Sequence, residues 1–398
     1  ATCRNHPICT SWGCLTCEPP NTPEPCAQTM YPAFSSLGTI PFPQPQVGTP
    51  HMAISSSDSN DCAKPKRVFV TYESRFGGYL DALPGLKLLL ASMNEFAPGE
   101  QLYVFIPQEQ PAFREWALSH APNSILEVVD FGGIVGYNIK PMSLMRLLDR
   151  GFDEVIWLDS DLMLERPMGT LFDRPPETIM VVEENGPWND GVTTYWPDLR
   201  LARPLAHAVN SSIIRVTRQH RAVLMAWNER MQRREYSEAQ AQPREKRPMA
   251  LLTDQEVLAG ILASDLAASW PVDFVRSGRD LIHCLNIDGL GYRWRCLYRR
   301  PVFLHAHGIK AWWPMALRQS PYWSRVFFDT SPHTRRAAHR YGHLLAHDEQ
   351  AWLRFGHRLS FALHVAFLGN PFRANYAFLI IRRLARMVER MRGRRGNG

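Results

Sequence analysis

The sequence has no long hydrophobic run and no leader-like N-terminus. No stretch approaches the roughly 20 apolar residues that a helix needs to cross a bilayer. The first residues also lack the basic segment followed by an apolar segment that makes a signal peptide. We therefore expect no membrane-spanning helix. Because the sequence begins with Ala1, we expect an upstream part to be missing; Met52, 16 residues before the first expected strand, is an alternative start.

Cysteine is scarce where a core can form. Six of the eight cysteines precede residue 65, and only Cys284 and Cys296 follow it, which argues against a globular part built on disulfides. Cys14-x-x-Cys17 can begin a zinc site, but no second pair follows at ligand spacing. Zinc and disulfides both stay open for residues 1–65, a segment rich in Pro, Ser and Thr that we expect to be disordered.

Lysine is also scarce, since the chain has six lysines and 39 arginines, with a net charge of +7. This modest basic excess favours an anionic partner, such as a nucleotide or a membrane surface, without choosing between them. We expect no nucleic acid among the partners.

An alternation of apolar strands and amphipathic helices begins at Arg67 and predicts a mixed, mostly parallel α/β sheet flanked by helices. The expected domain spans residues 66–325. Its first strands are expected at 68–72, 101–107, 125–130 and 154–158, with helices at 79–96, 112–120 and 140–150. Later strands are expected at 178–183, 208–216 and 301–304, helices at 218–236 and 254–263, and a polar loop at 237–250.

Two further segments have open interpretations. Trp188, Tyr195 and Trp196 lie in a loop-like stretch and form either a platform for a sugar ring or a loop that packs its own aromatics. Residues 326–398 are expected to be a helical extension. Its basic amphipathic end, 371–398, either contacts a membrane surface or docks on the protein itself.

The stretch from Glu154 to Asp161 carries the clearest chemical signal. A short apolar run of the kind that forms a buried strand ends in Asp159-Ser160-Asp161. Side chains at positions i and i+2 project to the same side, so the two carboxylates converge where only a cation relieves their repulsion. Such oxygen ligands suit Mg²⁺ or Mn²⁺. The plainer alternative is an aspartate pair that forms a turn or caps a helix.

Two later segments place this motif in a family context. Asn210-Ser211-Ser212 is followed, after an expected long helix, by Thr253-Asp254-Gln255, and His305-Ala306-His307-Gly308-Ile309-Lys310-Ala311-Trp312 comes later. Together with Asp-x-Asp, these segments resemble the nucleotide-sugar glycosyltransferases of the GT-A fold, and the last is similar to the His-x-x-Gly-x-x-Lys-Pro-Trp element of glycosyltransferase family 8, the glycogenin and galactosyltransferase-like group. The chain departs from that element in two ways: one residue separates Gly308 from Lys310, where the family usually has two, and Ala311 replaces Pro.

The resemblance implies a divalent cation, Mn²⁺ or Mg²⁺, that bridges the diphosphate of a donor such as a UDP-sugar. Asp159, Asp161 and His305 would hold it, with His307 as the alternative histidine. Lys310 would stabilise the leaving group; otherwise it is a surface lysine. The acceptor would be a glycan, a lipid or a protein, and the mechanism would be retaining by analogy.

The resemblance also implies donor contacts by Thr71, Tyr72, Lys140, Ser160, Asn210, Ser211 and Gly308, and a catalytic role for Asp254 and Gln255 beside Lys310. Three of these residues have a structural alternative: Tyr72 can be a core aromatic, Lys140 a surface lysine, and Asp254 a first-turn residue that favours its helix.

Two other functions stay open. The first is a phosphohydrolase of the haloacid dehalogenase type, whose nucleophile also follows an apolar strand in Asp-x-Asp. The second is a catalytically silent GT-A domain that binds a partner or acts as a chaperone. A bacterial chain is expected in the cytoplasm or at the cytoplasmic membrane face. A eukaryotic chain with a missing anchor is expected in the Golgi lumen.

Overall fold

The computed structural model describes residues 65–77, 81–134, 136–184, 188–284 and 301–307, with Lys310, Trp312, Trp313, Ala337, residues 339–347, 349–350 and Met387. The predictions for residues 1–64, for Gly308 and for nearly all of the C-terminal extension lie outside these residues. No helix in the described part is long and apolar enough to cross a bilayer.

A seven-stranded sheet is the centre of the fold, with the strand order β3-β2-β1-β4-β7-β6-β8. Neighbours run parallel in four pairs, whereas β7 runs antiparallel to both β4 and β6. This mixed, mostly parallel sheet flanked by helices confirms the predicted fold class. The strands are β1 (Arg67–Tyr72), β2 (Leu102–Ile106), β3 (Ser124–Val128), β4 (Glu154–Leu158), β6 (Ile179–Glu183), β7 (Val209–Thr217) and β8 (Val272–Val275).

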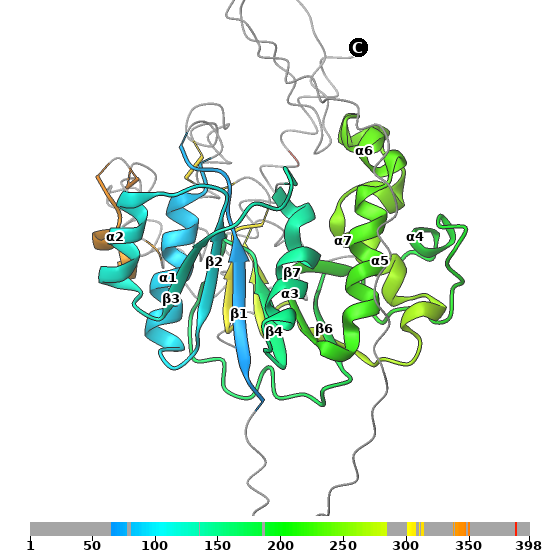
Figure 1. Cartoon of the computed structure of the whole chain (residues 1–398), viewed down its shortest axis with the longest axis horizontal. Helices are drawn as coiled ribbons and strands as arrows, with labels where there is room; N and C mark the ends of the chain where they lie inside the picture. Colours follow the sequence, from blue (N-terminus) through cyan, green and yellow to red (C-terminus); the bar gives the residue numbers. More distant parts are fainter. Residues whose placement is uncertain are drawn as a thin grey trace, which may run out of the picture. The chain divides into compact units, whose positions relative to one another are not determined.

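Helices cover both faces of the sheet, and Figure 1 shows α3 in front of it. The side chains of β1 and β4 alternate between two hydrophobic cores, one on each face of the sheet. On one face, Val70 and Val155 are among the residues that pack with α3, α5 and α7. On the other face, Phe69 and Ile156 are among those that pack with α1 and α2. Since both faces of β4 are buried, its sequence is a continuous apolar run after Glu154. The helices are α1 (Leu83–Phe96), α2 (Pro111–His120), α3 (Lys140–Asp149), α4 (Gly191–Thr194), α5 (Arg221–Gln232), α6 (Arg234–Gln240) and α7 (Asp254–Leu262).

A second, small sheet carries His305, the first residue of the late histidine motif, and was not predicted as a sheet. Its order is β5 (Leu162–Leu164), β10 (Phe303–His305) and β9 (Leu281–His283), with β10 antiparallel to β5 and parallel to β9. The first of these strands directly follows Asp161. The pairing therefore brings the end of β4, the end of β9 and the end of β10 together.

Several boundaries differ from the predictions. The helix expected at 218–236 is wrong as one element: Arg233 is extended, with ψ 146°, and separates α5 from α6. The polar loop expected at 237–250 is also wrong, since α6 reaches Gln240 and two 3₁₀ turns follow it. The first helix begins at Leu83 rather than residue 79 because Pro84 occupies its first turn.

The aromatic loop gives a further correction. Trp196 is 1% exposed and packs in the core, so it cannot offer a face to a sugar ring. Tyr195 is 39% exposed and meets Trp196 edge-on, with ring centroids 5.3 Å apart. The alternative, a loop that packs its own aromatics, holds for Trp196.

Candidate metal centre

Asp159, Asp161 and His305 form one group at the ends of β4 and β10. One ligand atom from each lies within 4.8 Å of the others, which is the arrangement of a group that could hold a metal ion. The backbone fixes this meeting: the amide of Asp159 donates to Ser212 O (2.8 Å), and the amide of Ala306 donates to Asp161 O (3.1 Å). The fold thus unites residues 144 positions apart in the sequence.

Asp161 is the buried carboxylate of the group. Its Oδ1 lies 3.4 Å from Nε2 of His305, and its Oδ2 accepts from the ammonium of Lys310. Burial alone would raise the pKa of Asp161, but its interactions with the Lys310 ammonium and the His305 ring outweigh burial and hold the pKa well below its usual range. Asp161 is therefore ionised and ready to bind a cation. Lys310 also donates to Ala306 O (2.7 Å).

Asp159 is the more exposed ligand and belongs to a second polar network. Its Oδ1 accepts from the indole of Trp157 (2.7 Å) and lies 2.9 Å from the Lys140 ammonium. The same ammonium lies 3.3 Å from Asp254 and 2.9 Å from the hydroxyl of Ser211. Lys140 is thus a buried bridge between two carboxylates rather than a surface lysine.

The charges in this network follow from burial. Burial would lower the pKa of Lys140, but Asp159 and Asp254 raise it above its ordinary value, so the ammonium stays charged. Burial raises the pKa of Asp254, and the pairing with Lys140 and the hydroxyl of Ser211 (2.7 Å) offsets only part of this. Asp254 also begins α7, after Thr253, whose hydroxyl donates to Glu256 instead of capping the backbone.

Ser160 and Asn210 join the same region through two glutamates that were not predicted. The Ser160 hydroxyl donates to Glu73 (2.6 Å), whose carboxylate also holds Arg75. The positive charge of Arg75 interacts with both motif aspartates. Asn210 donates to Glu184 (2.8 Å), and Nε2 of His307 lies 3.8 Å from the same carboxylate.

Three further predicted residues, Gln255, Thr71 and Tyr72, lie outside the Asp159–Asp161–His305 group. Gln255 is half-buried and donates to Glu256 (3.1 Å). Thr71 and Tyr72 end β1, where both are buried, and Tyr72 packs edge-on against Phe131. The catalytic role of Gln255 and the donor-binding roles of Thr71, Tyr72 and Gly308 stay predictions.

His283 is the principal residue that the sequence did not reveal. It is fully buried at the end of β9, and its Nδ1 lies 3.0 Å from Nδ1 of His305. Burial lowers the pKa of His283 to about 4 and that of His307 to about 3. The available signal was a polar residue that ends a short apolar run, Leu281-Ile282-His283.

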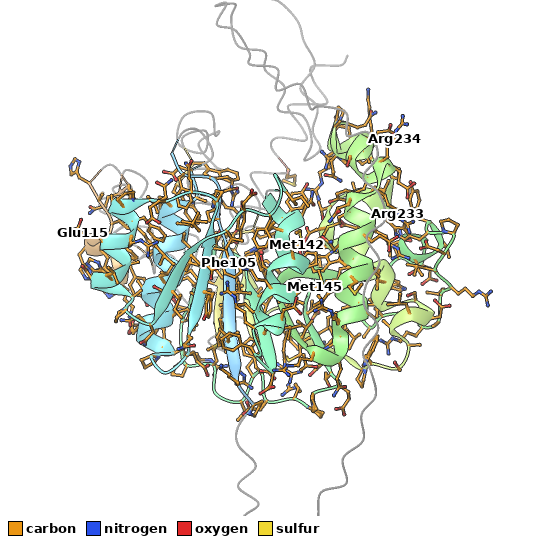
Figure 2. The ribbon with its side chains drawn as sticks, in the orientation of Figure 1. Phe105, Glu115, Met142, Met145, Arg233 and Arg234 are labelled. Atoms are coloured by element: carbon orange, nitrogen blue, oxygen red, sulfur yellow. The ribbon has the colours of Figure 1, made fainter. Side chains whose placement is uncertain are left out.

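A surface hollow is lined by residues other than those of this centre. It measures about 720 Å³ between α3 and α5, and Met142, Met145, Arg146 and Arg221 are among its lining residues. Figure 2 shows the two methionines on α3, the helix that begins with Lys140. None of the predicted site residues lines this hollow.

Comparisons with known proteins give likenesses among solved structures. No family model and no curated protein matches this chain. Among solved structures, it is similar to the apo structure of WbbM, a bifunctional glycosyltransferase, with a TM-score of 0.39 and 13% sequence identity. The match covers 68% of this chain and 52% of the other, so this chain spans about half of that structure. At this level of similarity, inferences about function rest on the geometry of the site.

Proposed function

We propose that this protein is a metal-dependent glycosyltransferase that moves a hexose from a nucleotide sugar, such as a UDP-sugar, to a glycan, lipid or protein acceptor. The observation that carries the proposal is the Asp159–Asp161–His305 group, flanked by Lys310 and Lys140. Two carboxylates and an imidazole meet two cationic side chains at the C-terminal ends of strands, which is where open α/β sheets bind nucleotides.

The donor set fits a divalent cation. Two carboxylates and one imidazole are the ligand types that Mn²⁺ accepts, and the imidazole favours Mn²⁺ over Mg²⁺. Charge counting supports the fit, since among the residues that the structure describes the lysines paired with Asp159, Asp161 and Asp254 are Lys140 and Lys310. A bound cation would act as a Lewis acid toward the diphosphate of the donor.

The protein's own groups have distinct parts in this proposal. Lys310 donates to Asp161, and with a cation bound to that carboxylate its ammonium would be available to stabilise the phosphate oxygens of a donor. Lys140 fixes the orientation of Asp159 by holding its Oδ1, together with Trp157. The buried carboxylate of Asp254 holds the Lys140 ammonium in place. We therefore give Asp254 a positioning role, which reaches the metal centre through Lys140 and Asp159.

Retention of configuration belongs to the proposal by analogy alone. A contact between residues 371–398 and a membrane surface is likewise proposed, because the sequence of that segment is basic and amphipathic. Both concern how and where the enzyme works. Neither affects the metal centre.

The experiment is a donor panel. The purified full chain is incubated with UDP-linked and other nucleotide-linked hexoses, with Mn²⁺ or with EDTA, and release of nucleoside diphosphate is measured. We expect release from at least one donor that requires Mn²⁺ and is faster with an acceptor. Phosphate release from p-nitrophenyl phosphate without donor turnover would instead favour the phosphohydrolase. Absence of both activities, with no binding of UDP, would contradict the enzyme proposal.

A further inference from the structure

His283 is held against the candidate ligand His305 by the register of the small sheet. The two histidines are direct partners in the parallel pairing of β9 with β10, with Leu281 opposite Phe303 and Ile282 opposite Leu304. Paired positions in neighbouring strands point to the same face. Their Nδ1 atoms are 3.0 Å apart, and both side chains are buried.

The hydrogen bonds of this pair have one consistent direction. Nε2 of His283 lies 3.2 Å from the backbone carbonyl of Glu183, which can only accept. A hydrogen on that Nε2 leaves Nδ1 of neutral His283 as an acceptor. Nδ1 of His305 must then carry the hydrogen that joins the two rings.

A hydrogen on Nδ1 of His305 determines the state of its other nitrogen, Nε2. With its hydrogen on Nδ1, a neutral His305 has a lone pair on Nε2, the atom that faces Asp161 at 3.4 Å. A lone pair directed at a carboxylate oxygen is unfavourable unless a proton or a metal cation lies between them. The opposite arrangement would set Nε2 of His283 and the Glu183 carbonyl against each other as two acceptors.

We propose that His283 is a positioning residue that sets the tautomer of His305, so that Nε2 of His305 is presented as a ligand in the candidate metal centre. The inference rests on the proposed metal-binding function. Partners of this kind fix the ring orientation of a histidine ligand, and their loss typically weakens metal affinity by about 10- to 100-fold.

The first test needs no metal. Full-length protein labelled with ¹⁵N-histidine is studied in its metal-free form by long-range ¹H–¹⁵N correlation, with the signals assigned through His283→Asn and His305→Asn. We expect a hydrogen on Nε2 and a bare Nδ1 in His283, and a hydrogen on Nδ1 of His305. A hydrogen on Nδ1 of His283 would overturn the proposal, whether or not the protein binds a metal.

The second test measures Mn²⁺ affinity by titration followed by electron paramagnetic resonance. His283→Phe keeps a ring of similar size but removes the acceptor, and it should weaken binding about 10- to 100-fold. His283→Asn places an oxygen near the position of Nδ1 and should recover most of that loss. Equal losses in two variants that both remain folded by circular dichroism would refute positioning through the hydrogen bond.

The two tests separate this inference from the proposed function. If the unaltered protein binds no Mn²⁺, the proposed function fails, while the tautomer measurement still decides the role of His283. His220→Asn serves as the control, because His220 is a buried histidine that contacts none of the candidate ligands. We expect its Mn²⁺ affinity to match that of the unaltered protein.

Discussion

The two ends of β4 carry buried charges that are satisfied to very different degrees. At the first residue, Glu154 pairs with Arg215 and Arg67. The Arg215 guanidinium donates to Glu154 and to the carbonyls of Pro175, Thr178 and Arg174, which uses its five N–H donors. This end is closed, since its charged groups already have the partners they need.

The other end of the same strand is open. Three carboxylates, Asp159, Asp161 and Asp254, share the ammonium groups of Lys140 and Lys310. An imidazole nitrogen faces one of these carboxylates at 3.4 Å. A bound cation would therefore balance the negative charge of this group, whereas Glu154 is already balanced by its arginines.

The difference separates structural from functional burial of charge. A closed network can be expected to matter for stability, because removing one member leaves its partner buried and uncompensated. An open network can be expected to matter for binding, because its members already tolerate an incomplete set of partners. Changes at the two ends should therefore affect different measurements.

Asp161→Asn should have the largest effect, and it should be on activity. The substitution removes a charged ligand while keeping the shape of the side chain, so Mn²⁺-dependent donor turnover should fall by more than about 10³-fold. The midpoint of thermal unfolding should stay within a few degrees of the original value. Initial rates with saturating donor, together with calorimetry, measure both.

The matched control is Asp173→Asn, an exposed aspartate at the closed end that pairs with Arg67. Its activity should be unchanged. If folded Asp161→Asn retains Mn²⁺-dependent turnover, β4 does not end in a metal centre.

Glu154→Gln should have the largest effect on stability. It leaves Arg215 buried at 1% exposure without its carboxylate, and breaking such a pair costs about 3–5 kcal/mol in the free energy of unfolding. Urea unfolding measures the loss, and the turnover of the folded fraction should be unaffected. A double variant, Glu154→Leu with Arg215→Met, should recover part of the stability, because neither Glu154 nor Arg215 then leaves a buried charge, although the carbonyls of Pro175, Thr178 and Arg174 lose a donor. A Glu154→Gln protein as stable as the original would show that this end is not closed by its ion pairs.

The same contrast explains what could be predicted from the sequence. The strand Glu154–Leu158 was predicted with its observed bounds because both of its faces are buried, which leaves a continuous apolar run. The Asp-x-Asp group and the late histidine were predicted through motifs. His283 was not, because its partner lies 22 residues away and their meeting depends on the register of two three-residue strands. Short strands leave too little periodicity to detect.

The break at Arg233 illustrates a second limit. Neither Gly nor Pro marks the position, and the residues on both sides favour a helix. In the structure, Arg233 pairs with Asp198 (2.9 Å), and its ring neighbour Trp196 is buried against α5. Tertiary contacts of this kind override a local helical pattern, and no local pattern encodes them.

Lys310→Met should produce two smaller effects of opposite sign. The loss of a competing ammonium from Asp161 should strengthen Mn²⁺ binding by about 3- to 10-fold, by Coulombic attraction. Turnover should nevertheless fall about 10- to 100-fold, because the developing charge on the diphosphate loses a donor. Mn²⁺ titration and initial rates at saturating Mn²⁺ distinguish the two effects.

Lys66→Met, an exposed lysine at the closed end, is the control. Weaker Mn²⁺ binding in Lys310→Met would mean that this ammonium does not compete with a cation.

The smallest effect concerns pH at the closed end, where His220 follows the strand residue that pairs with Glu154. Its Nδ1 accepts from the amide of Thr217 (2.9 Å), and burial lowers its pKa to about 4. Since the folded pKa lies below the unfolded value of about 6.5, the unfolded state binds the proton first. The contribution of His220 to the free energy of unfolding is then fully present above pH 6.5 and is lost as the pH drops toward 4.

Between pH 7 and 5, the free energy of unfolding should drop by about 1–2 kcal/mol more in the original protein than in His220→Asn. His283 and His307, which also have lowered pKa values, are common to both proteins and cancel in the difference. Urea unfolding at the two pH values measures it, and equal drops would show that His220 does not couple this end of the sheet to pH.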